Sequence, residues 1–342
     1  KETTIILKNI LIGDVWFCSG QSNMAFQLQN SENGAAEVKK AIANSTIRLF
    51  NAKAIRDTDE TAWDAATLVK TNQLEFFSGS WSVCDSISVK DFSAIAYYFG
   101  KNIAREENVP VGLIQVAVGG SPIESWIDRN TLEHDDKVVD VLTNWRKSDF
   151  IMPWVRERAN VNLKNATIAK QRHPYDPSYN FEAGVEAFTK FPLKGVIWYQ
   201  GESNAHNVEL YEHLMQKLVE SWRKAWDTNL PFYYVQLSSM ERPTWPAFRD
   251  MQNRLQNKIP NSGMAISMDY GDALNVHPIK KKEVADRLAL LALRNTYGKD
   301  VIANGPSAVK AIQKGDNILV SFALAKQLTT ADKKELIGFE LV

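Results

Sequence analysis

The chain has 342 residues, and its 40 Lys and Arg balance 40 Asp and Glu, so its formal net charge at pH 7 is zero. A chain without excess positive charge lacks the electrostatic footprint of a nucleic-acid-binding protein. Hydrophobic residues make up 44% of the sequence, but no apolar run is long enough to cross a bilayer. The composition is typical of a globular protein with neither a nucleic-acid partner nor a membrane span.

Apolar runs that end in small polar residues recur along the chain and indicate buried strands. Such runs, rich in β-branched and aromatic residues, occupy residues 15–18, 46–50, 111–118, 195–199, 232–237 and 263–268. They alternate with stretches that have helical apolar spacing, at residues 31–43, 91–103, 211–226 and 284–293. The repeated strand–helix–strand units predict an α/β fold with a doubly wound, mostly parallel sheet and helices on both faces.

Three segments depart from this alternation. Residues 51–90 are polar, with scattered tryptophans, and are predicted to run over the surface. Residues 131–192 predict helices followed by an irregular loop. After the main domain, over residues 13–300, runs at 318–322 and 336–342 look like strands without helices, so we predict a small β appendage over residues 301–342.

Four strand ends carry residues of use in acyl transfer, namely Ser22, Gly119-Gly120, Asn204 and His277. This chemistry needs a nucleophile, a base that takes its proton, and donors aimed at the developing oxyanion. Serine and histidine supply the first two, while the N–H groups of a glycine turn and an asparagine amide can supply the third. Because ligands bind at the carboxyl ends of parallel strands, one sheet edge can hold all four.

Each position also has a simpler interpretation. The two glycines can close a tight turn, Asn204 can cap the following helix, and His277 before Pro278 can be an ordinary loop residue. None of these accounts for their coincidence at successive strand ends. The remaining histidines fall in polar stretches or near the helix after Asn204, and we predict that they are non-catalytic: His134, His173, His206 and His213.

Other reaction classes lack their motifs. The chain has no Gly-x-Ser-x-Gly elbow, phosphate-binding loop or dinucleotide fingerprint. It also has no His-Glu-x-x-His motif or cysteine cluster, so we expect neither a metal nor an organic cofactor. The two cysteines, Cys18 and Cys84, leave a disulfide open and fix no compartment.

Four ordered blocks resemble a known family: SGQSNM at 19–24, GGSPIESW at 119–126, WYQGESN at 198–204 and HPIKKK at 277–282. They are similar to the sialate O-acetylesterase branch of the SGNH (GDSL-like) hydrolases, which also resembles bacterial acetylxylan esterases. The resemblance covers about residues 13–297. It implies an SGNH-hydrolase-like domain over residues 13–300. It further implies that residues 1–12 are the terminal strand segment of a flanking β domain, and that residues 338–340 begin another.

Carried over to these blocks, the resemblance implies that Ser22 is the nucleophile and His277 the general base, then acid. It places the oxyanion hole at the Ser22 N–H, the Gly119-Gly120 turn and the Asn204 side chain. Further residues would support the site or brace the glycine turn: Gln21, Gln200, Glu202, Glu124 and Trp126.

The chain departs from the family pattern in one respect. Such hydrolases place an aspartate two or three residues before the histidine, where this chain has Asn275 and Leu274. An asparagine accepts a hydrogen bond from the imidazole but brings no charge to stabilise its cation. Five alternatives stay open: Asp272 or Asp269 takes this place, Asn275 or a backbone carbonyl orients the ring, or activity is reduced.

The resemblance implies an esterase that removes O-acetyl groups from sialic acid through an acetyl-serine intermediate. Two alternatives are deacetylation of xylan or another polysaccharide and a catalytically weak carbohydrate-binding protein. Acetylated glycans lie outside the cell, and the abrupt start at Lys1 leaves room for a removed signal, so we expect a periplasmic or secreted protein.

Overall fold

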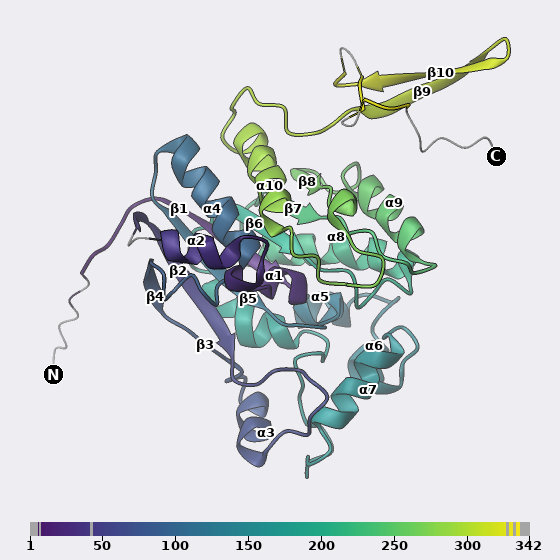
Figure 1. Cartoon of the computed structure of the whole chain (residues 1–342). Helices are drawn as coiled ribbons and strands as arrows, with labels where there is room; N and C mark the ends of the chain where they lie inside the picture. The colour runs from purple at the N-terminus through teal and green to yellow at the C-terminus, as the bar shows by residue number, and fades with distance from the viewer. Residues whose placement is uncertain (1–5, 7, 42–43, 326–327, 331–332, 336–342) are drawn as a thin grey trace.

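The computed structural model describes residues 6, 8–41, 44–325, 328–330 and 333–335 (Figure 1). The predicted strand at 336–342 and most of the segment before Lys8 lie outside these residues. Within the described part, no helix is both long and apolar enough to span a bilayer.

A mostly parallel sheet forms the centre of the molecule, as predicted. Six parallel strands lie in the order β2-β5-β1-β6-β7-β8, with β3 and β4 antiparallel to β2. Their bounds are β1 Asp14–Gly20, β2 Asn44–Ala54, β3 Phe77–Ser78, β4 Trp81–Cys84, β5 Val111–Ala117, β6 Gly195–Tyr199, β7 Phe232–Val235 and β8 Ser262–Ala265.

Helices cover both faces of this sheet, and neighbouring residues of β1 show why. Successive side chains of a strand point to opposite faces. Trp16 contacts Phe99 of α4, with ring centroids 4.9 Å apart, whereas Phe17 contacts Trp222 of α8 at 5.4 Å. The helices are α1 Ser22–Ala25, α2 Gly34–Lys40, α3 Ala65–Asn72, α4 Ala94–Glu107, α5 Arg129–Glu133, α6 Val141–Asn144, α7 Pro153–Asn162, α8 Val208–Ala225, α9 Trp245–Leu255 and α10 Lys281–Asn295.

The structure corrects two expectations. Residues 51–90 do not simply run over the surface, because β3 and β4 extend the sheet beyond β2 and Trp63 is fully buried against Phe76 and His173. The predicted helix at 31–43 is shorter, since a 3₁₀ turn ends at Asn30 and α2 starts only at Gly34.

The β appendage is confirmed as a hairpin of β9 Ser307–Lys314 and β10 Asn317–Ala323, which form a separate antiparallel sheet. The predicted strand at 318–322 lies within β10. The two cysteines are both buried free thiols, so no disulfide joins Cys18 to Cys84. Burial alone raises the pKa of the Cys18 thiol, and it is also the main cause that raises that of Cys84 to about 12.

Candidate active site

The adjacent strands β5, β1 and β6 bring three of the predicted segments to one sheet edge. All three strands are parallel, so their carboxyl ends lie side by side, at the place where open α/β sheets bind ligands. At the end of β1, Gly20 has a φ of +142°, and a Cβ there would lie 2.1 Å from the carbonyl oxygen of Tyr199. The glycine therefore permits the close turn that starts α1 at Ser22.

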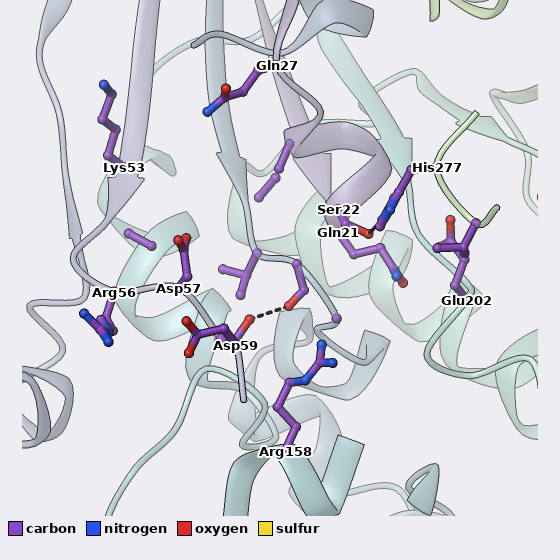
Figure 2. Close-up of a pocket in the computed structure, with 18 of the residues that line it drawn as sticks. Gln21, Ser22, Gln27, Lys53, Arg56, Asp57, Asp59, Arg158, Glu202 and His277 are labelled. Carbon is purple, nitrogen blue, oxygen red and sulfur yellow. Dashed lines mark hydrogen bonds between the residues drawn. The ribbon is translucent and has the colours of Figure 1, made fainter. Parts of the chain in front are cut away.

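Ser22 and His277 are in direct contact. His277 lies on the loop between β8 and α10, and its Nε2 is 2.8 Å from Ser22 Oγ (Figure 2). Burial first, and then the positive charge of Lys281, lower the pKa of His277. A neutral imidazole at hydrogen-bond distance from a hydroxyl is the arrangement that proton transfer from that hydroxyl requires.

The glycine turn after β5 presents backbone N–H groups beside Ser22. The Gly119 carbonyl is held by Thr58 Oγ1 at 2.7 Å and Tyr175 Oη at 2.8 Å. Gly120 has a φ of +73°, and a Cβ there would lie 2.3 Å from Tyr175 Oη. In the described part of the chain, the N–H groups of both glycines donate to no protein acceptor. They remain available for a ligand oxygen.

Asn204 and Gln200 lie behind this turn rather than in the cleft that Ser22 lines. Asn204 Oδ1 accepts from the Ile123 N–H at 2.9 Å and from Gln200 Nε2 at 2.8 Å. Asn204 Nδ2 donates to Glu124 Oε2 at 2.9 Å, and burial raises the pKa of that carboxyl to about 7. Neither amide is among the cleft-lining residues. A direct contact of Asn204 with an oxyanion stays a prediction. Its hydrogen bonds to Ile123 and Glu124, in the segment after the turn, are observed.

Gln21 and Glu202 do line the cleft. Gln21 Oε1 accepts from the N–H groups of Gly201 at 3.3 Å and Ser203 at 3.5 Å. Within the described residues, its NH₂ group donates to no protein atom. Glu202 is buried, which raises its pKa, and its Oε1 accepts from Asn23 Nδ2 at 2.5 Å.

No carboxylate among the described residues contacts the His277 ring. Asp272 Oδ1 accepts from the N–H groups of Leu274 at 2.8 Å and Asn275 at 2.9 Å, so it shapes the loop. Asn275 Oδ1 accepts from the backbone N–H of His277 at 2.9 Å, not from its ring. Asp269 forms an ion pair with Arg287 at 2.6 Å. The structure thus brings Ser22 and His277 together without bringing Asp272 to them.

Two residues beside the pair were not singled out from the sequence. Asn23 is buried and donates to the Val276 carbonyl at 2.9 Å as well as to Glu202, and the buried Lys281 ammonium donates to Asn23 Oδ1. A signal existed for Lys281, because it falls at helical spacing before Val284 and Ala285 on the buried face of α10.

The cleft has a volume of about 1010 Å³, which is in the range of sites that hold small molecules. Opposite Ser22 it is lined by residues 51–54 and 56–60, with Arg158 of α7 pointing into it (Figure 2). The guanidinium of Arg158 lies 5.0 Å from the ring centroid of Trp154. In the part of the chain that the structure describes, no group of three or more His, Cys, Asp or Glu side chains is placed to bind a metal ion.

A parallel sheet with a hydrogen-bonded serine and histidine at its carboxyl edge is the architecture of an α/β esterase. The chain belongs to the family described as carbohydrate esterase, sialic acid-specific acetylesterase, which matches residues 12–149 and 166–293. The family resemblance found in the sequence is thereby confirmed.

Curated relatives agree with this membership. The chain is 28% identical over 376 residues to Sialate O-acetylesterase of Rattus norvegicus and 29% identical over 362 residues to that of Mus musculus. These alignments cover 99% and 95% of this chain but 66% and 64% of the relatives, so it spans slightly less than two thirds of their length. It is also similar to the crystal structure of a carbohydrate acetylesterase from Xanthomonas citri, with a TM-score of 0.69 and 26% identity over 91% of this chain and 63% of that one.

Proposed function

We propose that this chain is a serine carbohydrate esterase that removes O-acetyl groups from sialic acid through an acetyl-serine intermediate on Ser22. The observation that carries the proposal is the 2.8 Å contact between Ser22 Oγ and His277 Nε2 in a cleft of small-molecule size. The relatives are named for sialate O-acetylesterase activity, which makes acetylated sialic acid the first substrate to test.

In the first half of the reaction, His277 Nε2 accepts the hydroxyl proton while Ser22 Oγ bonds to the acetyl carbonyl carbon. The oxyanion that forms accepts hydrogen bonds from the N–H groups of Ser22 and the glycine turn. When this intermediate collapses, the bond between the carbonyl carbon and the sugar oxygen breaks. That oxygen takes the proton from the His277 imidazolium, so a sugar hydroxyl leaves and an acetyl ester stays on Ser22.

In the second half, water replaces the sugar hydroxyl. His277 takes a proton from the water, whose oxygen bonds to the acetyl carbon, and the same N–H groups receive the oxyanion. Breakage of the bond to Ser22 Oγ releases acetic acid and returns the proton to Ser22. Because every proton passes between His277 and oxygen atoms, this route is complete with the side chains and water alone.

The test is acetate release from O-acetylated sialic acid and from acetylated xylan, measured for the chain, for Ser22→Ala and for Ser307→Ala. Ser307 is an exposed serine at the start of β9 and serves as the matched control. We expect release from the sialic acid that is lost in Ser22→Ala and unchanged in Ser307→Ala. A Ser22→Ala variant that is as active as the parent chain would refute the role of Ser22 as nucleophile.

The other outcomes separate the alternatives. Release from xylan alone would keep the mechanism and change the substrate from sialic acid to a polysaccharide. The similar structure from Xanthomonas citri is named only as a carbohydrate acetylesterase, which is consistent with either sugar. A folded protein that releases no acetate and whose Ser22 does not react with a fluorophosphonate probe would be a carbohydrate-binding protein instead.

A further inference from the structure

A buried cation lies near the Ser22–His277 pair. Lys281 is only 1% exposed, and its ammonium donates to Asn23 Oδ1. The ammonium also lies over two aromatic rings, 4.6 Å from the centroid of Phe26 and 5.6 Å from that of Tyr199. Burying a lysine among aromatic rings is costly unless its charge has a use or a partner.

Asn23 joins this cation to both catalytic segments. It follows Ser22 directly in the chain, and its Nδ2 donates to the carbonyl of Val276, the residue before His277, at 2.9 Å. The same Nδ2 donates to Glu202 Oε1 at 2.5 Å. One buried amide thus ties the start of α1 to the loop after β8, while Lys281 occupies its oxygen and fixes its orientation.

We propose that Lys281 is a positioning residue of the catalytic pair: through Asn23 it holds the segments of Ser22 and His277 together, and its charge adds to burial in favouring a neutral His277 before the reaction. This inference rests on the proposed function. The charge acts in the opposite sense to an aspartate. An adjacent carboxylate would stabilise the imidazolium that forms when His277 takes the serine proton, whereas an adjacent ammonium favours the neutral imidazole of the resting site.

The other charged groups around His277 do not cancel this effect. Glu202, on the loop after β6, is bound to Asn23 and is itself pushed toward its neutral form by burial. Asp272, on the same loop as His277, is turned to the amides of Leu274 and Asn275. More distant walls of the cleft carry both signs: Asp57, Asp59, Glu60 and Asp91 against Lys53, Arg56, Arg158 and Arg242.

Burial lowers the pKa of Lys281 to about 7, so the ammonium is charged in the acidic range where His277 titrates. The lowered pKa of His277 then means that its neutral form persists to a pH below the ordinary value of 6.5. Removing the charge should raise the pKa of His277, and the acidic limb of the rate profile should move to higher pH.

The experiment compares Lys281→Met and Lys281→Gln with the matched control Lys282→Met. Lys282 is the next residue, is exposed and pairs with Asp286 at 2.6 Å. Both variants of Lys281 should move the acidic limb of kcat/KM for an acetyl ester to higher pH, and the control should not. Lys281→Gln retains a donor for Asn23 Oδ1, so it should keep more of the plateau kcat than Lys281→Met.

A second readout needs no turnover. The titration midpoint of the His277 imidazole, followed by nuclear magnetic resonance and assigned with His277→Gln, should rise in both Lys281 variants. If folded Lys281→Gln shows the parent's His277 titration midpoint and the parent's acidic limb of kcat/KM, the proposed role of the charge is overturned. If the chain releases no acetate, the proposed function fails, while the midpoint still tests the influence of Lys281 on His277.

The contact through Asn23 has its own test. Asn23→Ala leaves the cation in place but removes the link between the two segments, and we expect kcat to fall by roughly 10²-fold, as for a small misplacement of reacting groups. A folded Asn23→Ala variant with an unchanged kcat would overturn the positioning role.

Discussion

Substitution of Gly120 by alanine should disrupt the glycine turn and the catalytic step together. An L-residue held near φ +73° costs about 1–2 kcal/mol. The new Cβ would lie 2.3 Å from Tyr175 Oη and 3.0 Å from the Trp154 ring, so Tyr175 must move. Its hydrogen bond to the Gly119 carbonyl is then weakened, at a further cost of about 1 kcal/mol. We expect the free energy of unfolding in urea to fall by roughly 2–3 kcal/mol.

The same substitution should lower kcat about 10²-fold, because in the proposed mechanism the displaced turn supplies donors to the oxyanion. Gly119→Ala is the matched control for stability, since its Cβ would meet only Ser22 Cβ at an ordinary 3.7 Å. That variant should unfold like the parent, although its methyl group beside the proposed nucleophile Ser22 should reduce kcat/KM. Combining Gly120→Ala with Tyr175→Phe removes the clashing hydroxyl, so the double variant should lose less stability than the sum of the single variants. Parent-like stability of Gly120→Ala, or strict additivity, would refute this account of the turn.

Three further outcomes are expected. Replacing Asp64, whose carboxylate accepts from the Thr67 N–H at 2.8 Å and caps α3, with alanine should lower the free energy of unfolding in urea, and Asp64→Asn should lower it less. Burial raises the pKa of Glu124 from 4.5 to about 7, so its contribution to stability is full below pH 4.5 and is lost as the pH rises to about 7. Glu124→Gln should remove roughly 3 kcal/mol from the pH dependence of the free energy of unfolding. A variant whose stability depends on pH as the parent's does would contradict this assignment. Neither Cys18 nor Cys84 should react with a thiol reagent in the folded protein, and two thiols should react after unfolding; fast labelling of the native protein would show that their burial is incomplete.

Sequence patterns predicted the central sheet because its strands are buried on both faces and read as continuous apolar runs. They did not predict β3 and β4, which are two and four residues long and owe their pairing to β2 rather than to their own composition. The helix α9 was also missed. Its buried residues Trp245, Phe248 and Met251 do have helical spacing, and its proline lies in the first turn, where a helix tolerates it.

The site was predictable where chemistry and strand ends coincide. Ser22, His277 and the glycine turn come together because parallel strands end at one edge. Asn204 was noticed for the same reason, yet its place behind the turn depends on side-chain packing that no local pattern encodes. Lys281 is one of three consecutive lysines, and only the phase of α10 selects it for burial. Its contact with Asn23, 258 positions earlier, is purely tertiary.

The contact between Ser22 and His277 joins positions 255 residues apart, one after β1 and the other after β8. Contacts so distant along a chain form slowly, because a large loop must close before they stabilise anything. The two residues are therefore expected to meet late in folding. During refolding, recovery of the proposed esterase activity should therefore lag behind recovery of the helical signal.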